Sequence, residues 1–303
     1  MSVILSVHEL TRYYGRIRAV DGISFEVVSG SVYGLLGPNG SGKTTTLSMI
    51  MGSVIPRSGT FHWFGNMKNS ASDNRRIGSL IEAPRFYPYL TLEQNLMILA
   101  RIKEVDPAEI RRVLETTLLW ERRSSHYSTL SLGMKQRLGI AAALLGDPEV
   151  LVLDEPANAL DPEGIADVRR IILEEASKGK TIIMASHILD EVEKVCTHVA
   201  ILKKGKIIAE GLVQELLAEG DSLVVEAYDI EKLAAILGES PLVASLRRDN
   251  GALVLSLKKE VSPAEINQLA FSHNIVLTRL EQKKKSLESQ FLELVKKEGV
   301  KEK

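Results

Sequence analysis

The sequence contains a single cysteine, Cys196, among its 303 residues. One cysteine excludes an internal disulfide and a metal site built from several thiolates, and this scarcity is typical of a reducing compartment. Apolar runs such as residues 140–145 are far shorter than the roughly 18 residues that span a bilayer. The first ten residues lack the basic segment of a signal peptide. We therefore expect a cytoplasmic chain that does not itself cross a membrane.

An excess of charge of either sign is also missing, because 38 Lys and Arg residues stand against 39 Asp and Glu residues, a net charge of -1. A chain without a basic surplus lacks the electrostatic footprint of a protein that binds nucleic acid in bulk. Aromatic residues make up only 5% of the chain, but hydrophobic residues make up 45%. This composition excludes a disordered or fibrous protein, and the length allows one large domain or two unequal ones.

Over the first 220 residues, short apolar segments alternate with helical patterns. The alternation predicts an α/β fold with a mostly parallel sheet covered by helices. A helical insertion is expected at residues 91–145, where Asp106-Pro107-Ala108-Glu109 has the pattern of an N-cap, a first-turn proline and a capping-box acid. The expected strands are residues 23–28, 32–36, 60–64, 150–153 and 181–185, and the expected helices are residues 44–51, 163–177 and 189–196.

The pattern changes near residue 220, where we place a boundary between two domains, residues 1–220 and 221–303. The second part predicts the element order βαββαβ of a small α+β ferredoxin-like domain. No motif in it names a site, so ligand binding, stabilisation of a dimer and simple packing all stay open. Its expected elements are strands at residues 223–228, 242–247, 253–257 and 275–280, helices at 230–237 and from 263, a turn at Asp249-Asn250-Gly251, and a closing amphipathic helix at 283–295.

The clearest chemical motif is a glycine-rich loop between an expected strand and an expected helix. It fits the P-loop pattern, in which small residues let successive backbone N–H groups wrap a phosphate while the following helix offers its positive end. The Lys43 side chain can reach the terminal phosphates, and the Thr44 hydroxyl can bind Mg²⁺. The expected nucleotide-binding residues of the loop are Gly37, Pro38, Asn39, Gly40, Ser41, Gly42, Lys43, Thr44 and Thr45.

Two adjacent acids, Asp154 and Glu155, end the apolar segment 150–153. A buried parallel strand has no structural need for acids at its end, whereas this edge of a sheet is where ligands bind. We expect Asp154 to hold Mg²⁺ and Glu155 to polarise a water molecule. The alternative, a surface loop with two acids, becomes unattractive once the P-loop is taken into account.

Between these motifs lies Leu130-Ser131-Leu132-Gly133-Met134-Lys135-Gln136-Arg137, which resembles the LSGGQ signature of ATP-binding cassette (ABC) proteins. With it, residues 1–220 resemble the nucleotide-binding subunit of ABC transporters. The resemblance implies a P-loop NTPase fold of the ABC type with a helical subdomain at about residues 91–145. It also implies that Ser131 and the Gly133 N–H complete the γ-phosphate site of a second copy, so that a head-to-tail homodimer encloses two ATP molecules.

Three further single residues, outside these motifs, resemble site residues of the family. Tyr14 resembles the aromatic residue that stacks on adenine, although a core tyrosine is equally compatible and Tyr13 is adjacent. Asp161 resembles the aspartate of the loop that spans the dimer interface, and Asp161-Pro162-Glu163 is also a plain helix cap. His187 follows the expected strand 181–185 and resembles the histidine that contacts the γ-phosphate.

The chain departs from the usual family pattern at Leu132 and Met134, which stand in the signature where glycine and glutamine are usual. Glu82 stands where the family usually has a glutamine that binds Mg²⁺ and water, and would bring a charged oxygen to the metal. Together these features are similar to a subgroup that exports bacitracin-like or lantibiotic peptides. The next segment, Pro84-Arg85-Phe86-Tyr87-Pro88-Tyr89, is either an ordered turn or a socket for a helix of a membrane partner.

The resemblance as a whole implies an ATP-hydrolysing subunit that drives a separate transmembrane permease and is held by it at the inner face of the membrane. ATP and Mg²⁺ are the implied cofactors, with Glu155 as general base and Lys43 and His187 completing the catalytic set. The alternatives are a soluble ABC ATPase acting on a ribosome or nucleic acid, or a regulatory ABC protein. Ribosomal members resemble paired cassettes and DNA-repair members carry a long coiled coil, and the sequence has neither.

Overall fold

The computed structural model describes residues 2–66, 73, 75–82, 85–218, 222–249, 251–258, 261–283 and 287. The chain divides into two compact units, Met1–Val213 and Gln214–Lys303, which are described separately below. The domain boundary expected near residue 220 falls on residues 219–221, outside the described residues. Within the described residues, no helix combines the length and the apolar character that crossing a bilayer would need.

A mostly parallel sheet forms the centre of the first unit, in the strand order β5-β6-β7-β3-β8-β9. All neighbouring strands are parallel except β8 and β9, which confirms the predicted α/β class. Strands β3, β6 and β7 are buried along their whole length, as expected of apolar strands that are covered on both faces. The bounds are β3 Val32–Leu36, β5 Ile77–Leu80, β6 Val150–Asp154, β7 Thr181–Ser186, β8 His198–Lys203 and β9 Lys206–Leu212.

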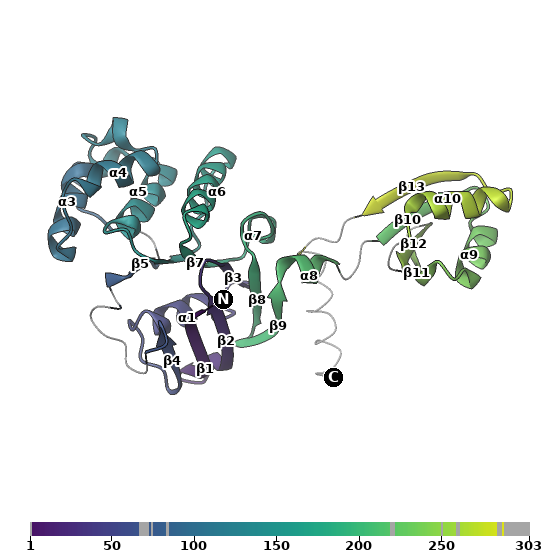
Figure 1. The fold of residues 1–303 in the computed structure, drawn as a ribbon, viewed down its shortest axis with the longest axis horizontal. Helices are drawn as coiled ribbons and strands as arrows, with labels where there is room; N and C mark the ends of the chain where they lie inside the picture. The colour runs from purple at the N-terminus through teal and green to yellow at the C-terminus, as the bar shows by residue number, and fades with distance from the viewer. Residues whose placement is uncertain are drawn as a thin grey trace. The chain divides into compact units, whose positions relative to one another are not determined.

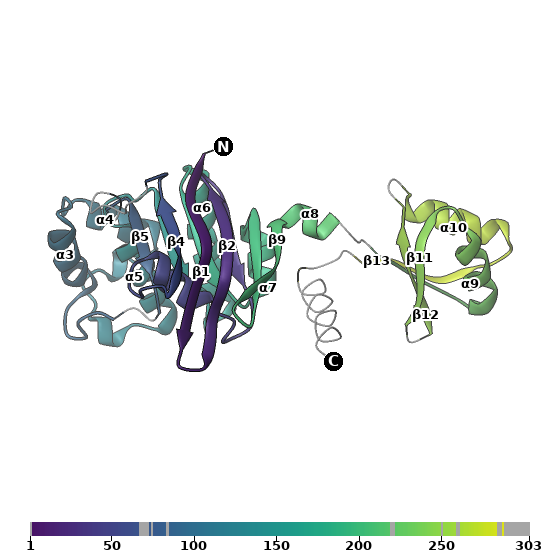
Figure 2. The same cartoon turned by 90° about the horizontal axis from the view of Figure 1, so that it is seen from below.

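A second, antiparallel sheet has the order β2-β1-β4 and was not predicted (Figure 2). Its strands are β1 Val3–Tyr14, β2 Ile17–Val28 and β4 Ser58–Trp63. The expected strand at residues 23–28 is only the end of β2. Strand β1 escaped prediction because its alternation of apolar and polar residues breaks where the pairing with β2 shifts between Val7 and Leu10, with Glu9 at a φ of 48°.

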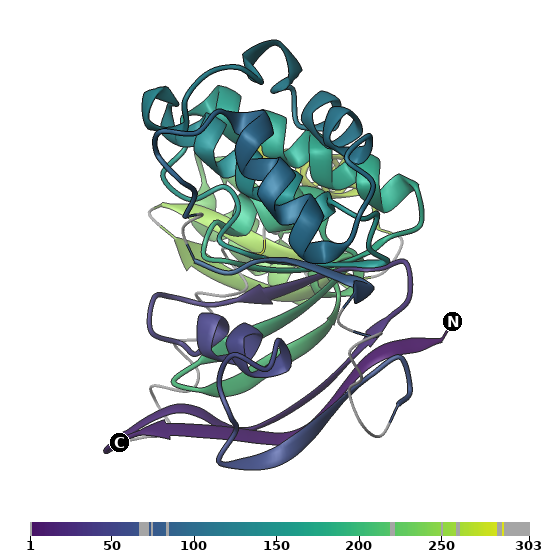
Figure 3. The ribbon, with the colours of Figure 1, turned by 90° about the vertical axis from the view of Figure 1, so that its left-hand side faces the viewer.

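Helix α1 (Lys43–Ile50) lies between the two sheets (Figure 3). Apolar side chains of the helix and of both sheets form one continuous core. Leu47 and Met49 of α1 are completely buried there, beside residues of β1, β2, β3, β6 and β7. Helices α6 (Pro162–Ser177) and α7 (Leu189–Val195) also belong to this unit. The start of α1, and with it the glycine-rich loop, is therefore held rigidly against both sheets.

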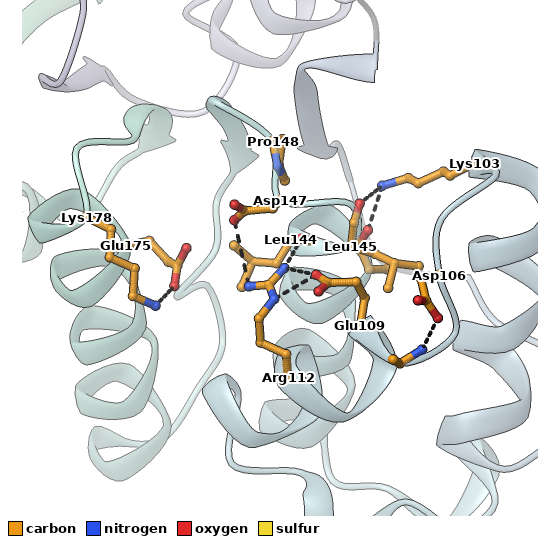
Figure 4. A network of polar contacts seen from close by, with 12 residues as sticks. Lys103, Asp106, Glu109, Arg112, Leu144, Leu145, Asp147, Pro148, Glu175 and Lys178 are labelled. Atoms are coloured by element: carbon orange, nitrogen blue, oxygen red, sulfur yellow. Dashed lines mark hydrogen bonds and ion pairs between the residues drawn. The ribbon is translucent and has the colours of Figure 1, made fainter.

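The expected helical insertion contains α3 (Leu92–Lys103), α4 (Glu109–Thr116) and α5 (Leu132–Leu144), which gather together in Figure 1. Thr91 caps α3 with a complete capping box. The prediction of a helix capped by Asp106 was wrong. The Asp106 carboxylate accepts the N–H of Ala108 in a turn, and α4 begins only at Glu109, whose carboxylate pairs with Arg112 instead of closing a capping box (Figure 4).

A polar network joins this helical region to the sheet at the loop that follows α5 (Figure 4). Arg112 of α4 donates to the Leu144 carbonyl and lies 3.8 Å from Asp147. Lys180, before β7, approaches the Asp147 carboxylate to 2.6 Å, and this hydrogen bond lowers the pKa of Asp147. Because the Lys180 side chain is only 9% exposed, its charge needs these partners. The network fixes the end of α5 to the core.

The second unit has the predicted element order βαββαβ, and its antiparallel sheet has the order β11-β12-β10-β13 of a ferredoxin-like fold. Helices α9 and α10 cover one face of this sheet and share an apolar core with it. The last strand starts at residue 277, two residues later than expected. Asn250 and the closing helix expected at 283–295 lie outside the described residues, apart from 283 and 287. The elements from α8 onward are α8 Val213–Ala218, β10 Ser222–Ala227, α9 Ile230–Glu239, β11 Val243–Asp249, β12 Ala252–Leu257, α10 Pro263–Ser272 and β13 Leu277–Lys283.

Candidate nucleotide-binding site

The strand order places the predicted site residues along one edge of the parallel sheet. The glycine-rich loop follows β3, His187 follows β7 and Glu155 follows β6, and these strands are neighbours in the order β6-β7-β3. Because the strands are parallel, their carboxyl ends meet at the same edge. Glu82 follows β5, the next strand beyond β6. Residues as far apart in the sequence as Gly37 and His187 therefore meet at a single edge of the sheet.

The glycine-rich loop is wrapped too tightly for side chains at two of its glycines. A Cβ on Gly37 would lie 2.3 Å from the Leu202 carbonyl oxygen, and one on Gly42 would lie 2.4 Å from the Ala19 carbonyl oxygen. Both glycines also have positive φ angles, 154° and 110°. The close neighbours belong to strands β8 and β2, so the loop conformation depends on tertiary packing as well as on its own sequence.

The N-terminus of α1 points its free N–H groups at the loop without a side chain that caps them. The N-cap residue is Gly42, and the first turn contains no acid. Ser41 has a buried hydroxyl with no hydrogen-bond partner among the described residues. Uncapped amide groups, a helix dipole and an unpaired hydroxyl are the donors that bind a phosphate oxygen.

Lys43 is only 5% exposed, and its ammonium group lies inside the loop. It donates to the carbonyl oxygens of Gly37 at 2.7 Å and Pro38 at 3.4 Å, and it lies 3.3 Å from Glu155 Oε1. This carboxylate is the charged group that compensates the buried ammonium. A phosphate entering the loop would replace these oxygens with its own.

Glu155 lies between Lys43 and His187. Its Oε2 is 2.8 Å from His187 Nδ1, while its backbone N–H donates to the Ala185 carbonyl of β7. The backbone of Glu155 has a φ of 48°, an uncommon value for a residue other than glycine. This conformation turns the side chain out of the strand direction at the sheet edge, where one carboxylate is held by a cation and an imidazole.

Asp154 is buried, with 5% exposure, and burial raises the pKa of its carboxyl group. Hydrogen bonds from the Thr44 side chain and the Glu82 backbone act in the opposite direction. Its Oδ1 atom is buried and has no hydrogen-bond partner among the described residues. A carboxylate oxygen without a partner beside a threonine hydroxyl fits the hard-oxygen preference of Mg²⁺.

The described residues contain no group of three or more His, Cys, Asp or Glu side chains that could hold a metal ion by themselves. Asp154 and Thr44 would therefore supply only part of a Mg²⁺ coordination shell, as is usual where nucleotide phosphates and water supply the rest. The Glu82 side chain is exposed, and its residue has a φ of 63°. The contact between Glu82 and Asp154 is made by the Glu82 backbone.

Ser131 of the signature and Asp161 each cap a helix. Ser131 caps α5 and accepts the N–H of Met134 at 3.2 Å, and Asp161 caps α6 and accepts the N–H of Gly164 at 3.0 Å. Within the described parts of this chain, neither Ser131, Gly133 nor Asp161 forms a hydrogen bond or ion pair with the glycine-rich loop. One copy of the chain therefore does not bring the two halves of the predicted site together.

The two adjacent tyrosines have different environments. The Tyr13 hydroxyl donates to Asp21 at 3.0 Å, and the ring is approached by the guanidinium groups of Arg18 and Arg57. Tyr14 is 45% exposed, with the guanidinium of Arg12 4.9 Å from its ring centroid. Tyr14 is thus a surface residue and not a core tyrosine, and its ring is accessible.

A family model described as "ABC transporter" matches residues 20–158. The bacitracin transport ATP-binding protein BcrA of Bacillus licheniformis is 36% identical, with 97% of this chain and 98% of the relative covered. The linearmycin resistance ATP-binding protein LnrL of Bacillus subtilis (strain 168) is 34% identical, with 96% and 98% covered. The crystal structure of the ADP conformation of an ATP-binding cassette of an ABC transporter is similar with a TM-score of 0.65 at 26% identity, covering 72% of this chain and 96% of that one.

The chain belongs to the ABC transporter ATP-binding proteins. It is an ATP-hydrolysing subunit of an ABC transporter, which confirms the predicted family, fold and enzymatic class. The similarity to bacitracin-type members, expected from Glu82 and the altered signature, is also confirmed. These comparisons give no support to the ribosomal or nucleic-acid alternative.

A cleft of about 570 Å³ opens in this ABC ATPase next to Glu82. It is lined by residues of β5, of segment 85–87, of α3 and of α5. The buried Asn95 side chain accepts the N–H of Tyr87 at 2.9 Å and donates to its carbonyl oxygen at 3.2 Å, while the Tyr87 side chain is 62% exposed. Asn95 thus fixes the backbone of Tyr87, and the exposed Tyr87 ring lies at the cleft.

The sequence did not predict the residues outside the P-loop of this ABC ATPase that hold the loop in place through hydrogen bonds. The N–H of Gly205, in the β8–β9 turn, donates to the Ser41 carbonyl at 3.0 Å, and the Gly205 carbonyl accepts from Asp21. The turn Lys204-Gly205 between two apolar strands was the only available signal, and it predicts a hairpin without indicating what the hairpin touches.

Replacing Gly42 with alanine should lower the free energy of unfolding of this ABC ATPase by about 3 kcal/mol or more, because strained φ and a backbone clash coincide. Urea unfolding monitored by circular dichroism measures the effect. Gly40→Ala is the matched control, since Gly40 has a φ of 80° but no atom within 4 Å of its Cβ position. It should cost only about 1 to 2 kcal/mol. Equal unfolding midpoints for the two variants would contradict the expected clash.

Proposed function

We propose that this subunit binds Mg-ATP in the P-loop, closes head-to-tail on a second copy and hydrolyses ATP to drive a separate membrane permease. The observation that carries the proposal is the position of the Glu155 carboxylate, between Lys43 and His187 and next to the buried Asp154. A cation, a base, an imidazole and an incompletely bonded carboxylate are the groups that phosphoryl transfer to water requires.

In this proposal, Lys43 exchanges its present oxygen partners for the terminal phosphates of ATP. The loop amides and the α1 N-terminus bind the remaining phosphate oxygens. Thr44 and Asp154 would hold Mg²⁺, which when bound neutralises charge on the phosphates. The exposed ring of Tyr14 stacks on the adenine, and the Arg12 guanidinium stays in contact with the Tyr14 ring.

Glu155 is proposed as the general base, because release from Lys43 leaves its carboxylate free to accept a proton from water. His187, 2.8 Å away, positions that carboxylate and can donate to the γ-phosphate through its other ring nitrogen. The proton acceptor, Glu155, and the residue that positions it, His187, thus lie at the ends of the neighbouring strands β6 and β7.

A second copy would supply the missing half of each site. Ser131 and the Gly133 N–H lie at the exposed N-terminus of α5, where a helix offers donors to an anion. Asp161 caps the neighbouring helix α6. Among the described residues, Ser131, Gly133 and Asp161 make no hydrogen bond or ion pair with the P-loop of their own chain, which supports a composite site between two copies.

The cleft beside Glu82 is the proposed docking place for a helix of the permease. It is formed by both the sheet edge and the helical region, and Tyr87 and Tyr89 expose 62% and 83% of their surface nearby. Exposed aromatic side chains next to a cleft are typical of a recognition surface.

The substrate is proposed to be a peptide antibiotic or a similar amphiphile that is exported. The support comes from relatives described as a bacitracin transport protein and a linearmycin resistance protein, each matched along nearly their full length. Cells that express this chain with its permease should grow at higher bacitracin concentrations than cells with the Lys43→Ala chain. Equal growth of the two, with normal amounts of both proteins, would refute this substrate class.

Replacing Glu82 with Gln should shift the Mg²⁺ concentration for half-maximal ATPase activity by roughly three- to tenfold, because a charged oxygen becomes neutral. The affinity for ATP should change little. Phosphate release measured over a Mg²⁺ titration tests this, with Glu121→Gln in the exposed part of the helical region as control. Identical titrations for wild type and Glu82→Gln would remove Glu82 from the metal site.

A further inference from the structure

Helices α5 and α6 lie against each other along a seam that starts at their N-caps. Near the start, Leu160 Cδ2 lies 3.9 Å from the Cβ position of Gly133. Further along, Arg137 forms an ion pair with Asp167 at 3.0 Å. Gly133 and Arg137 are four residues apart on α5, and Gly164 and Asp167 are three apart on α6, so each pair shares one helix face. Leu160 lies just before the N-cap of α6.

The ion pair lies at the same distance from the N-cap in both helices. Arg137 is six residues beyond Ser131, and Asp167 is six residues beyond Asp161, which corresponds to about 9 Å along each axis. The side chains of Arg137 and Asp167 are 16% and 24% exposed. A pair that is largely shielded from water is screened less and holds a more definite geometry than a surface pair.

We propose that Arg137 and Asp167 are positioning residues that keep the N-termini of α5 and α6 in register, so that Ser131 and Asp161 meet the second copy as one surface. The inference rests on the proposed head-to-tail dimer. Neither residue touches ATP in this arrangement. Their loss would therefore weaken closure of the dimer and leave nucleotide binding to the P-loop unchanged.

Arg170 provides a matched control, because it also contacts Asp167, at 3.4 Å, but from within α6. An i,i+3 contact inside one helix cannot set the register between two helices. Arg170→Ala should therefore leave dimerisation unchanged, whereas Arg137→Met should weaken it, although both remove an arginine that contacts the same carboxylate.

The test uses the full chain with the Glu155→Gln change, and measures ATP-driven dimerisation by sedimentation and ATP binding at low protein concentration. Asp167→Asn should weaken dimerisation by about tenfold or more, because the pair occurs twice per dimer. ATP affinity should stay close to that of the parent, while the melting temperature should fall by a few degrees because Arg137 loses its charged partner in a largely shielded position. The exchanged pair, Arg137→Asp with Asp167→Arg, should recover dimerisation that either reversal alone abolishes.

Unchanged dimerisation of Asp167→Asn would overturn the inference while leaving the proposed function standing. An exchanged pair that restores the melting temperature but not dimerisation would do the same. A Glu155→Gln parent that stays monomeric at saturating ATP would overturn the proposed dimer and, with it, the role of this ion pair.

Discussion

Replacing Glu155 with Gln should lower the ATPase turnover number by about 10²- to 10⁴-fold, the range expected when a general base is lost. The affinity for ATP should not fall. Glu155 binds Lys43 in the present structure, at 3.3 Å, and thereby competes with phosphate for the ammonium group. The neutral amide competes less, so the variant should bind ATP at least as tightly and accumulate as a nucleotide-bound dimer.

Glu149→Gln is the appropriate control, because Glu149 precedes β6 at the opposite end of the strand and pairs with Arg76 on the surface. It should retain wild-type turnover. Phosphate release and equilibrium binding of a fluorescent ATP analogue separate turnover from affinity. If Glu155→Gln hydrolysed ATP at the wild-type rate, another group would have to accept the proton.

The individual motifs of the site are readable in the sequence because each is local. Lys43 and Thr44 lie in one short loop between a strand and a helix, and Asp154 and Glu155 end one strand. The contact between Lys43 and Glu155 is not local, since β7 lies between β3 and β6 in the sheet. Without the strand order, nothing in the sequence shows that His187, at the end of β7, meets the same carboxylate.

Other parts of the structure could not be derived because packing decides them. The antiparallel sheet depends on bulged pairing of β1 with β2, which breaks the periodic pattern by which strands are recognised. At Asp106, the sequence allows either a helix cap or a turn, and the competing pair between Glu109 and Arg112 favours the turn. Tyr13 and Tyr14 are adjacent tyrosines, and only their surroundings in the fold show that the Tyr13 hydroxyl is hydrogen-bonded while the Tyr14 ring is accessible.

Replacing Lys43 with Ala should weaken ATP binding by roughly 10- to 100-fold, the amount expected for losing a hydrogen bond between charged groups. Turnover should fall further, by about 10²- to 10³-fold, because negative charge develops on the phosphates during transfer and a positioned cation stabilises it. Calorimetric titration with ATP and phosphate-release kinetics measure these two effects.

The loop geometry also predicts that positive charge alone is insufficient at this position. Lys43→Arg keeps the charge, but a planar guanidinium does not fit a site that is 5% exposed and lined by the Gly37 and Pro38 carbonyl oxygens, so it should not restore activity. Lys206→Ala is the control for a general electrostatic effect, because Lys206 is exposed and pairs with Asp21 next to the loop. Lys206→Ala should bind ATP nearly as well as wild type. If it lost affinity as severely as Lys43→Ala, the surrounding charge and not the contact of Lys43 with phosphate would account for ATP binding.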